Sequence, residues 1–212
     1  MTTRLLLLTV CCTLPHCVLA FPTSLNYIPS ADHMERGTVR VELELDGYPT
    51  PFSNDPSLQV YTQVGVTDRF EVGLDWVDVN ADDDVQFNAK WQVTPESERY
   101  PAIAIGLMDV TDRGPLANWY VVASKAAGED FRLHAGLFDD DATRGMVGVE
   151  YYLSDRSELI ADWTTGPWAY ATVGYWHDLG DGVAALLYYG RCNTRDEKAD
   201  FVGLNAYWEG AW

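Results

Sequence analysis

The chain has 212 residues, with 14 Lys and Arg against 32 Asp and Glu, and its formal net charge is −18. This excess of acid excludes a nucleic-acid-binding protein, which needs clustered basic side chains for phosphate contacts. The 8 Trp, 12 Tyr and 7 Phe supply too much apolar area for a disordered chain. Beyond the N-terminus, no stretch of about eighteen apolar residues occurs, so no membrane-spanning helix is predicted.

The first twenty residues have the pattern of an export signal. Arg4 precedes an apolar run that ends in the small-residue cleavage pattern Val18-Leu19-Ala20. We therefore predict a signal peptide at residues 1–20, with a buried N-terminal strand or helix as the alternative. Removal of this peptide would leave Cys192 as the only cysteine, which excludes an intrachain disulfide framework and a Cys-based metal site.

The rest of the chain alternates apolar and polar residues with the period of β-strands. In the stretch 85–93, the odd-numbered residues are apolar and the even-numbered ones are Gln, Asn, Lys and Gln. Twelve strands are predicted, near residues 38–46, 57–66, 69–79, 84–94, 101–110, 117–125, 130–138, 145–153, 157–165, 168–177, 182–191 and 200–212. An even number of strands, joined mostly by short turns at one end and longer acidic loops at the other, is typical of an outer-membrane barrel.

The positions of the tryptophans favour this barrel over a soluble β-sandwich, in which apolar and polar residues would also alternate along each strand. All eight lie near the ends of predicted strands, where two membrane-interface belts are expected. These residues are Trp76, Trp91, Trp119, Trp163, Trp168, Trp176, Trp208 and Trp212. A large soluble core in which Trp ends the strands is the alternative interpretation.

The last strand provides a second indication. Apolar or small residues alternate along it up to the final Trp212, which resembles the C-terminal signal that barrel-insertion machinery reads. An apolar terminal strand in a soluble protein would leave an edge prone to aggregation, unless it paired with the first strand.

Charged residues in the strands provide the third indication, because most lie opposite the apolar face. A basic side chain exposed to lipid in mid-strand would cost about 2–4 kcal/mol, so we expect these residues to line the lumen. They are Arg40, Glu42, Glu44, Glu71, Asp75, Lys90, Arg132, Glu150, Asp162 and Glu209. Seven acids against three bases would favour cations in an open channel. A closed network of ion pairs that only stabilises the barrel is the equal alternative.

Candidate chemistry outside the lumen is sparse. Asp78, Asn80, Asp82 and Asp84 have oxygen ligands at calcium-loop spacing, but the Gly and Glu that an EF-hand loop requires are missing. A solvated acidic loop is therefore favoured over a metal site. His177 and Asp178 could form an acid–base pair in a hydrolase, but no serine in a glycine elbow accompanies them. We predict a non-enzymatic protein without a cofactor.

Three stretches resemble the YjbH-like outer-membrane barrel family, which is associated with exopolysaccharide and capsule production. They are Leu25–Asp32, Asn88–Asp109 and Tyr120–Lys125, and the hairpin Gly65–Gly73 is similar to one that barrel-type transporters share more widely. The resemblance implies a Gram-negative-type outer membrane and a link to polysaccharide secretion. It supplies no catalytic residues. Longer family members have more than the one barrel for which this chain has room.

The sequence therefore predicts an all-β protein, a single transmembrane antiparallel up-and-down β-barrel of about twelve strands. The expected organisation is a signal peptide at 1–20, a periplasmic lead-in or partial plug at 21–37, and the barrel at 38–212. The expected function is a porin-like channel or an envelope scaffold. Expected partners are outer-membrane lipid and lipopolysaccharide, the barrel-insertion machinery and components of polysaccharide secretion. A secreted soluble β-sandwich that binds carbohydrate and an outer-membrane hydrolase are the alternatives.

Overall fold

The computed structural model describes residues 23–47, 57–77, 79, 84–110, 118–139, 142–167, 169–194 and 200–212, with only the backbone of Asp84. The predicted signal peptide at 1–20 lies outside the described residues. The described residues form twelve strands: β1 (Thr38–Gly47), β2 (Ser57–Thr67), β3 (Phe70–Val77), β4 (Asp84–Thr94), β5 (Ala102–Leu107), β6 (Trp119–Ala126), β7 (Phe131–Asp139), β8 (Thr143–Ser154), β9 (Ser157–Thr164), β10 (Tyr170–Gly180), β11 (Val183–Cys192) and β12 (Phe201–Ala211).

The strands close into a single antiparallel barrel. Each strand pairs with its neighbours in the sequence, and β1 pairs with β12, so that Glu42 lies opposite Tyr207 and Glu44 opposite Asn205. Closure satisfies the edges that an open sheet would leave unpaired. The predicted fold class and the number of strands are confirmed. The soluble sandwich is excluded, because the strands form one closed sheet rather than two packed layers.

Two strand boundaries differ most from the prediction. Strand β5 ends at Leu107 rather than near residue 110, because Asp109 has a positive φ of 48° and its backbone N–H turns inward to the side chain of Asn88. Strand β10 continues to Gly180 rather than ending near residue 177. A register shift between Asp178 and Gly180 extends it into the turn, where Gly180 has a positive φ of 93°.

The outer surface of the barrel is apolar, whereas its interior contains polar and charged side chains together with an apolar cluster. Leu133, Leu187 and Trp91 are among the large apolar side chains exposed on its outer surface. Charged side chains such as Glu71 and Lys90 are buried in the interior. This arrangement is the one expected of strands that face lipid. In the described residues, no helix combines the length and apolar character that crossing a membrane requires.

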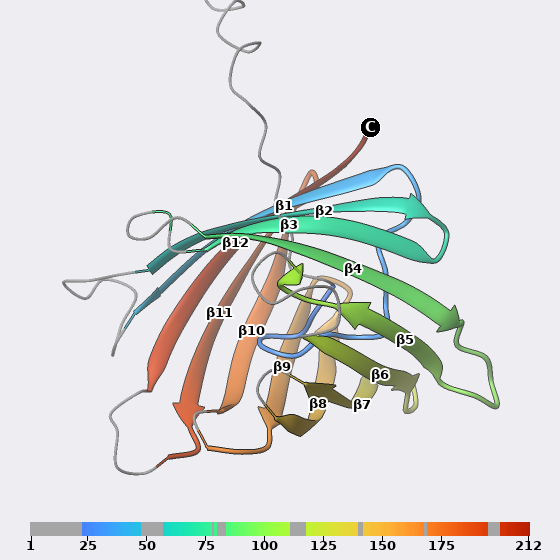
Figure 1. Ribbon diagram of the computed structural model, residues 1–212. Helices are drawn as coiled ribbons and strands as arrows, with labels where there is room; N and C mark the ends of the chain where they lie inside the picture. The colour runs from blue at the N-terminus through green and yellow to red at the C-terminus, as the bar shows by residue number, and fades with distance from the viewer. Residues whose placement is uncertain are drawn as a thin grey trace, which may run out of the picture.

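Residues 23–36, called the inner segment below, precede β1 and run through the interior of the barrel (Figure 1). Leu25, Ile28, Ala31 and Met34 of this segment are each at most 3% exposed. The first three belong to an apolar cluster that includes Tyr120 and other inward-facing strand residues. The segment therefore occupies part of the lumen.

Two glycines on the inner face of the barrel provide room for this segment. A Cβ atom at Gly65 would overlap the carbonyl group of Glu35, and one at Gly148 would overlap the side chain of Leu25. A larger residue at Gly65 would displace the backbone of the inner segment, so the close approach requires glycine there, whereas one at Gly148 would require the Leu25 side chain to move.

Candidate functional site

The interior of the barrel centres on a buried ion pair between β3 and β4. Lys90 Nζ lies 3.0 Å from Glu71 Oε1, and the two side chains are 0% and 1% exposed. Lys90 Nζ also donates to the carbonyl oxygens of Thr23, at 2.9 Å, and Ser30, at 3.3 Å. The ammonium group therefore holds the inner segment at two points while it neutralises Glu71.

Glu71 holds the same segment from the acceptor side. Its carboxylate accepts from the backbone N–H groups of Thr23, at 2.9 Å, and Met34, at 2.6 Å, and from the Thr23 hydroxyl. Gln63 on β2 donates to it as well. These charge-assisted hydrogen bonds connect both ends of the inner segment to one buried carboxylate.

A second carboxylate, on another part of the barrel wall, holds the middle of the segment. Asp162 on β9 accepts from the backbone N–H of Tyr27 at 2.8 Å and from the Thr172 hydroxyl at 2.5 Å. Asn26 donates to Thr172 at 3.0 Å and to the carbonyl oxygen of Ile160 at 3.1 Å. The segment is thus tied to β3, β4, β9 and β10.

A third set of contacts lies on β4, β6 and β7. Ser124 Oγ accepts from the backbone N–H of Ala31 at 2.8 Å and contacts His134 Nδ1 at 2.8 Å. Gln92 donates to the carbonyl oxygen of Ala31 at 2.8 Å. Arg132 forms an ion pair with Asp32 at 2.6 Å, which secures the part of the segment that follows Ala31.

Arg132 also links the inner segment to the connection between β4 and β5. Its Nη1 atom lies 2.6 Å from Glu96 Oε2, while Ala126 N donates to Glu96 Oε1 at 2.9 Å and Lys125 forms an ion pair at 3.2 Å. Burial raises the pKa of the Glu96 carboxyl, but these hydrogen bonds and charges outweigh it and lower the pKa from 4.5 to about 2.

Two cavities lie inside the barrel, one toward each end. The loop-end cavity, of about 400 Å³, includes Asp46 and Val77, at the ends of strands that lead into the longer connections. The turn-end cavity, of about 710 Å³, includes Glu96, Asp178 and Gly182, near the shorter connections. Ser24 and Leu25 line both cavities, so the inner segment forms the partition between them.

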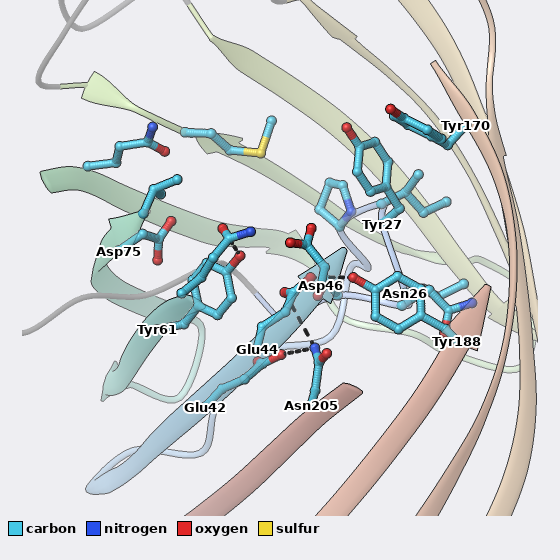
Figure 2. A pocket seen from close by; sticks show the side chains of 18 of the residues that line it. Asn26, Tyr27, Glu42, Glu44, Asp46, Tyr61, Asp75, Tyr170, Tyr188 and Asn205 are labelled. Carbon is cyan, nitrogen blue, oxygen red and sulfur yellow. Dashed lines mark hydrogen bonds between the residues drawn. The ribbon is translucent and has the colours of Figure 1, made fainter. Parts of the chain in front are cut away.

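The loop-end cavity is lined by carboxylates and aromatic rings, with Tyr61 and Tyr188 beside the carboxylates and Tyr27 and Tyr170 farther along the wall (Figure 2). Among the described residues that line it, every acidic or basic side chain is a carboxylate: Glu42, Glu44, Asp46 and Asp75. Tyr188 donates to Glu44, and Asn205 donates to Glu42 and Glu44. Rings of Tyr27, Tyr170, Phe201 and Tyr188 meet edge to face, with successive centroids 5.4, 5.0 and 5.6 Å apart.

The turn-end cavity has a mixed charge. Its lining includes Arg40, which pairs with Glu209 across the β1–β12 seam at 2.9 Å, and Arg132. Carboxylates of Asp32 and Glu96 neutralise Arg132 there. The turn-end lining as a whole has six carboxylates against these two arginines, whereas the described lining of the loop end has four carboxylates and no basic side chain: the six are Asp32, Glu96, Glu150, Glu158, Asp178 and Glu209.

All ten strand charges that the sequence places in the lumen point into the barrel. Seven of them line the two cavities described above. The other three, Glu71, Lys90 and Asp162, bind the inner segment. The structure does not bring the ten together in one network. They divide into an acidic set at the loop end, a set that anchors the inner segment, and a mixed set at the turn end.

One of the eight tryptophans does not face outward. Trp176 lines the turn-end cavity and packs against the interior cluster, because it shares the inward parity of Thr172 and Gly174 on β10. The expectation of an interfacial position for Trp176 is thus wrong. Trp91, Trp163 and Trp208 are exposed on the outside of their strands. Trp76 and Trp119 alternate with the buried residues of β3 and β6, and Trp212 is exposed at the C-terminus. Trp168 lies outside the described residues.

The candidate metal and hydrolase residues do not form a site in the part of the chain that the structure describes. Asp78, Asn80, Asp82 and the side chain of Asp84 lie outside it. Within the described ranges, no group of three or more His, Cys, Asp or Glu is arranged to hold a metal ion. His177 pairs with Ser157 at 2.7 Å, whereas Asp178 accepts from Arg156 at 3.3 Å, so their hydrogen bonds lead to different partners.

Sequence reasoning missed the residues that position the inner segment. Thr23, Asn26 and Asp32 make its contacts, and no periodic pattern marks them. The available signal was the pair of inward-facing glycines at 65 and 148, which indicate a close approach of another chain segment. The tyrosines of the loop-end cavity were also missed, since the aromatic residues considered were the tryptophans.

Most of the chain is similar to a known protein family. A family model described as "Exopolysaccharide biosynthesis protein YbjH" matches residues 23–167, which is more than half of the chain. The chain belongs to the YjbH family. The match begins with the inner segment, so this segment is part of the family region and not an addition to it. No curated protein matches the chain by sequence.

Solved structures show the same fold at low sequence identity. The barrel is similar to the KdgM porin, with a TM-score of 0.56 and 7% identity over 80% of this chain and 98% of that one. It is also similar to the outer membrane protein Omp33 of Acinetobacter baumannii, with a TM-score of 0.55 and 7% identity over 82% of this chain and 98% of that one. The YjbH-family chain therefore has a porin-like β-barrel fold.

Replacing Lys90 is expected to destabilise the barrel strongly. Lys90→Met leaves the Glu71 carboxylate buried without its cation, and the free energy of unfolding should fall by about 3–5 kcal/mol. Replacing both partners, as Glu71→Gln with Lys90→Met, should restore part of this loss. Denaturant unfolding in lipid vesicles measures all three.

The matched control for this change is Arg40→Met, which breaks the more exposed Arg40–Glu209 pair. Its cost should be about 0–1 kcal/mol, because solvent screens the charge that remains. An equal cost for Lys90→Met and Arg40→Met would contradict the assigned role of the buried pair.

The Glu96 contacts predict a loss of stability in acid. The pKa of Glu96 is lowered in the folded protein, so its contribution is complete above the ordinary value of 4.5 and disappears as pH falls through about 2. The difference in unfolding free energy between wild type and Glu96→Gln should therefore be largest near neutral pH and should shrink across this range. Glu98→Gln, on the same connection, is the control. A difference that does not change with pH would contradict the prediction.

Proposed function

We propose that this protein is a non-enzymatic outer-membrane channel that the inner segment closes, and that it serves exopolysaccharide secretion. The observation that carries the proposal is the shared lining of the two cavities by Ser24 and Leu25. One cavity lies toward each end of the barrel, and the inner segment separates the two. In a scaffold without conduction, we would expect side chains to fill the lumen on both sides of the inner segment.

The way in which the segment is held supports a movable partition. Its backbone binds strand side chains through hydrogen bonds to Glu71, Lys90 and Asp162 rather than by joining the sheet. Exchange of these side-chain partners would release the segment and leave every strand pairing of the barrel intact. The inner segment can therefore move without unfolding the wall around it.

The location, the link to exopolysaccharide and the absence of enzymatic activity in the proposal rest on other observations. The porin-like fold and the apolar outer surface favour an outer-membrane location. The description of the family model supports the connection with exopolysaccharide. Asp178 accepts from Arg156, so it does not orient His177 as an acid–base pair in a hydrolase would require, and this favours a channel. A scaffold without conduction is the outcome that would replace the channel.

Conductance in planar bilayers tests the closed channel. The wild-type protein should show little conductance, because the inner segment blocks the path. The double variant Glu71→Ala with Asp162→Ala removes acceptors from the backbone of Thr23, Met34 and Tyr27, and should conduct cations more readily than anions. Heat-modifiable gel mobility confirms that each variant retains its barrel.

The control is Glu150→Gln with Glu209→Gln, which removes two lumen charges that lie in the turn-end cavity. This variant should remain as poorly conducting as the wild type. A wild type with a wide, steady conductance would contradict closure by the inner segment, and a silent release variant with an intact barrel would favour a scaffold. Loss of secreted polysaccharide in a strain without the gene, restored by the wild-type protein, tests the cellular role.

A further inference from the structure

The loop-end cavity brings four carboxyl groups together without a basic side chain in its described lining. They belong to Glu42, Glu44, Asp46 and Asp75. The neutral donors Tyr188 and Asn205 bind Glu42 and Glu44 without supplying positive charge. Carboxylates gathered in a poorly solvated lumen repel one another, and a bound cation would relieve this repulsion.

Unsatisfied acceptors at the same place provide independent support for a ligand. Asp75 is 1% exposed, and its Oδ1 atom has no hydrogen-bond partner, although Oδ2 accepts from Asn88. Asn205 is 3% exposed, and its Oδ1 atom has no partner either. Buried acceptors of this kind are costly unless a donor meets them. A ligand that carries hydrogen-bond donors as well as positive charge would satisfy these acceptors.

The size and the aromatic wall of the cavity distinguish among cations. A volume of about 400 Å³ is larger than a bare metal ion needs and falls within the range of roughly 300–1,000 Å³ found for small-molecule pockets. Tyr188 places its ring beside the carboxylates, and Tyr27 and Tyr170 extend the aromatic wall away from them (Figure 2). Aromatic faces attract organic cations and pack against apolar ring surfaces, while their hydroxyl groups bind polar ones.

We propose that the loop-end cavity binds a cationic amino sugar, a hexosamine unit with a free, protonated amine. The ammonium group meets the carboxylates of Glu42, Glu44 and Asp75, the sugar hydroxyls donate to the remaining acceptors, and the ring lies against the tyrosine wall. The choice of a sugar over other amines rests on the proposed function in exopolysaccharide secretion. The requirement for a donor-rich cation rests on the cavity alone.

Calorimetry on the full-length protein in detergent micelles tests this assignment with four probes. Glucosamine should bind, whereas N-acetylglucosamine and glucose, which lack the charge, should bind at least about tenfold more weakly, as the loss of a charge-assisted hydrogen bond implies. Ethanolamine, which has the amine but no ring, should also bind more weakly. Equal affinities for glucosamine and glucose would overturn the cationic assignment, and equal affinities for glucosamine and ethanolamine would overturn the sugar assignment.

Two variants locate the site. Asp75→Asn and Glu44→Gln should each weaken glucosamine binding by about tenfold or more. Glu158→Gln, which removes a carboxylate from the turn-end cavity, should leave it unchanged. Heat-modifiable mobility shows which variants retain the barrel, and either lumen variant suffices for the test. Unchanged binding in a folded variant would overturn the site.

Two further results would overturn the inference. They are no glucosamine binding to the intact wild-type barrel, and calcium binding in its place. The conductance experiment is separate, since a wide wild-type pore would contradict the proposed closure without changing the glucosamine affinity. Failed glucosamine binding would likewise leave the conductance result intact.

Discussion

The Glu71–Lys90 ion pair determines how the interior of this barrel is filled. Two opposite charges in a poorly solvated lumen stabilise each other only if their remaining hydrogen-bonding capacity is also used. The barrel strands supply Gln63, and the inner segment supplies the rest: backbone N–H groups for Glu71 and carbonyl oxygens for Lys90. The buried pair and the inner segment therefore depend on each other, and the division of the lumen follows from this dependence.

The distribution of charge around that centre gives the two ends of the lumen different chemistry. At the turn end, Arg40 and Arg132 each pair with carboxylates, so part of the negative charge is compensated within the protein. At the loop end, the described lining offers carboxylates and tyrosines without a basic residue. A lumen of this kind is acidic on both sides of its partition, and the two sides differ because arginine side chains pair with carboxylates only at the turn end of the described lining.

The strands could be predicted from the sequence because a two-residue period has a direct physical cause, the alternation of side chains across a sheet. That period placed twelve strands and assigned inner charges such as Lys90 to the correct face. It did not show how the lead-in or partial plug predicted at 21–37 is held in the lumen, because the contacts of this segment join residues as far apart as Tyr27 and Asp162 and use backbone groups common to every residue. Trp176 shows the same limit, since nearness to a strand end was weighed above the parity that turns it inward.

Hydrogen exchange along residues 23–34 tests the central claim most directly, that this segment is bound inside the lumen. The backbone N–H groups of Thr23, Tyr27, Ala31 and Met34 donate to buried side chains, so in the intact protein they should exchange slowly, at rates closer to those of the strands than to those of a free chain. Exchange of all four at the rate of an unstructured peptide, from a barrel that remains folded, would contradict the account.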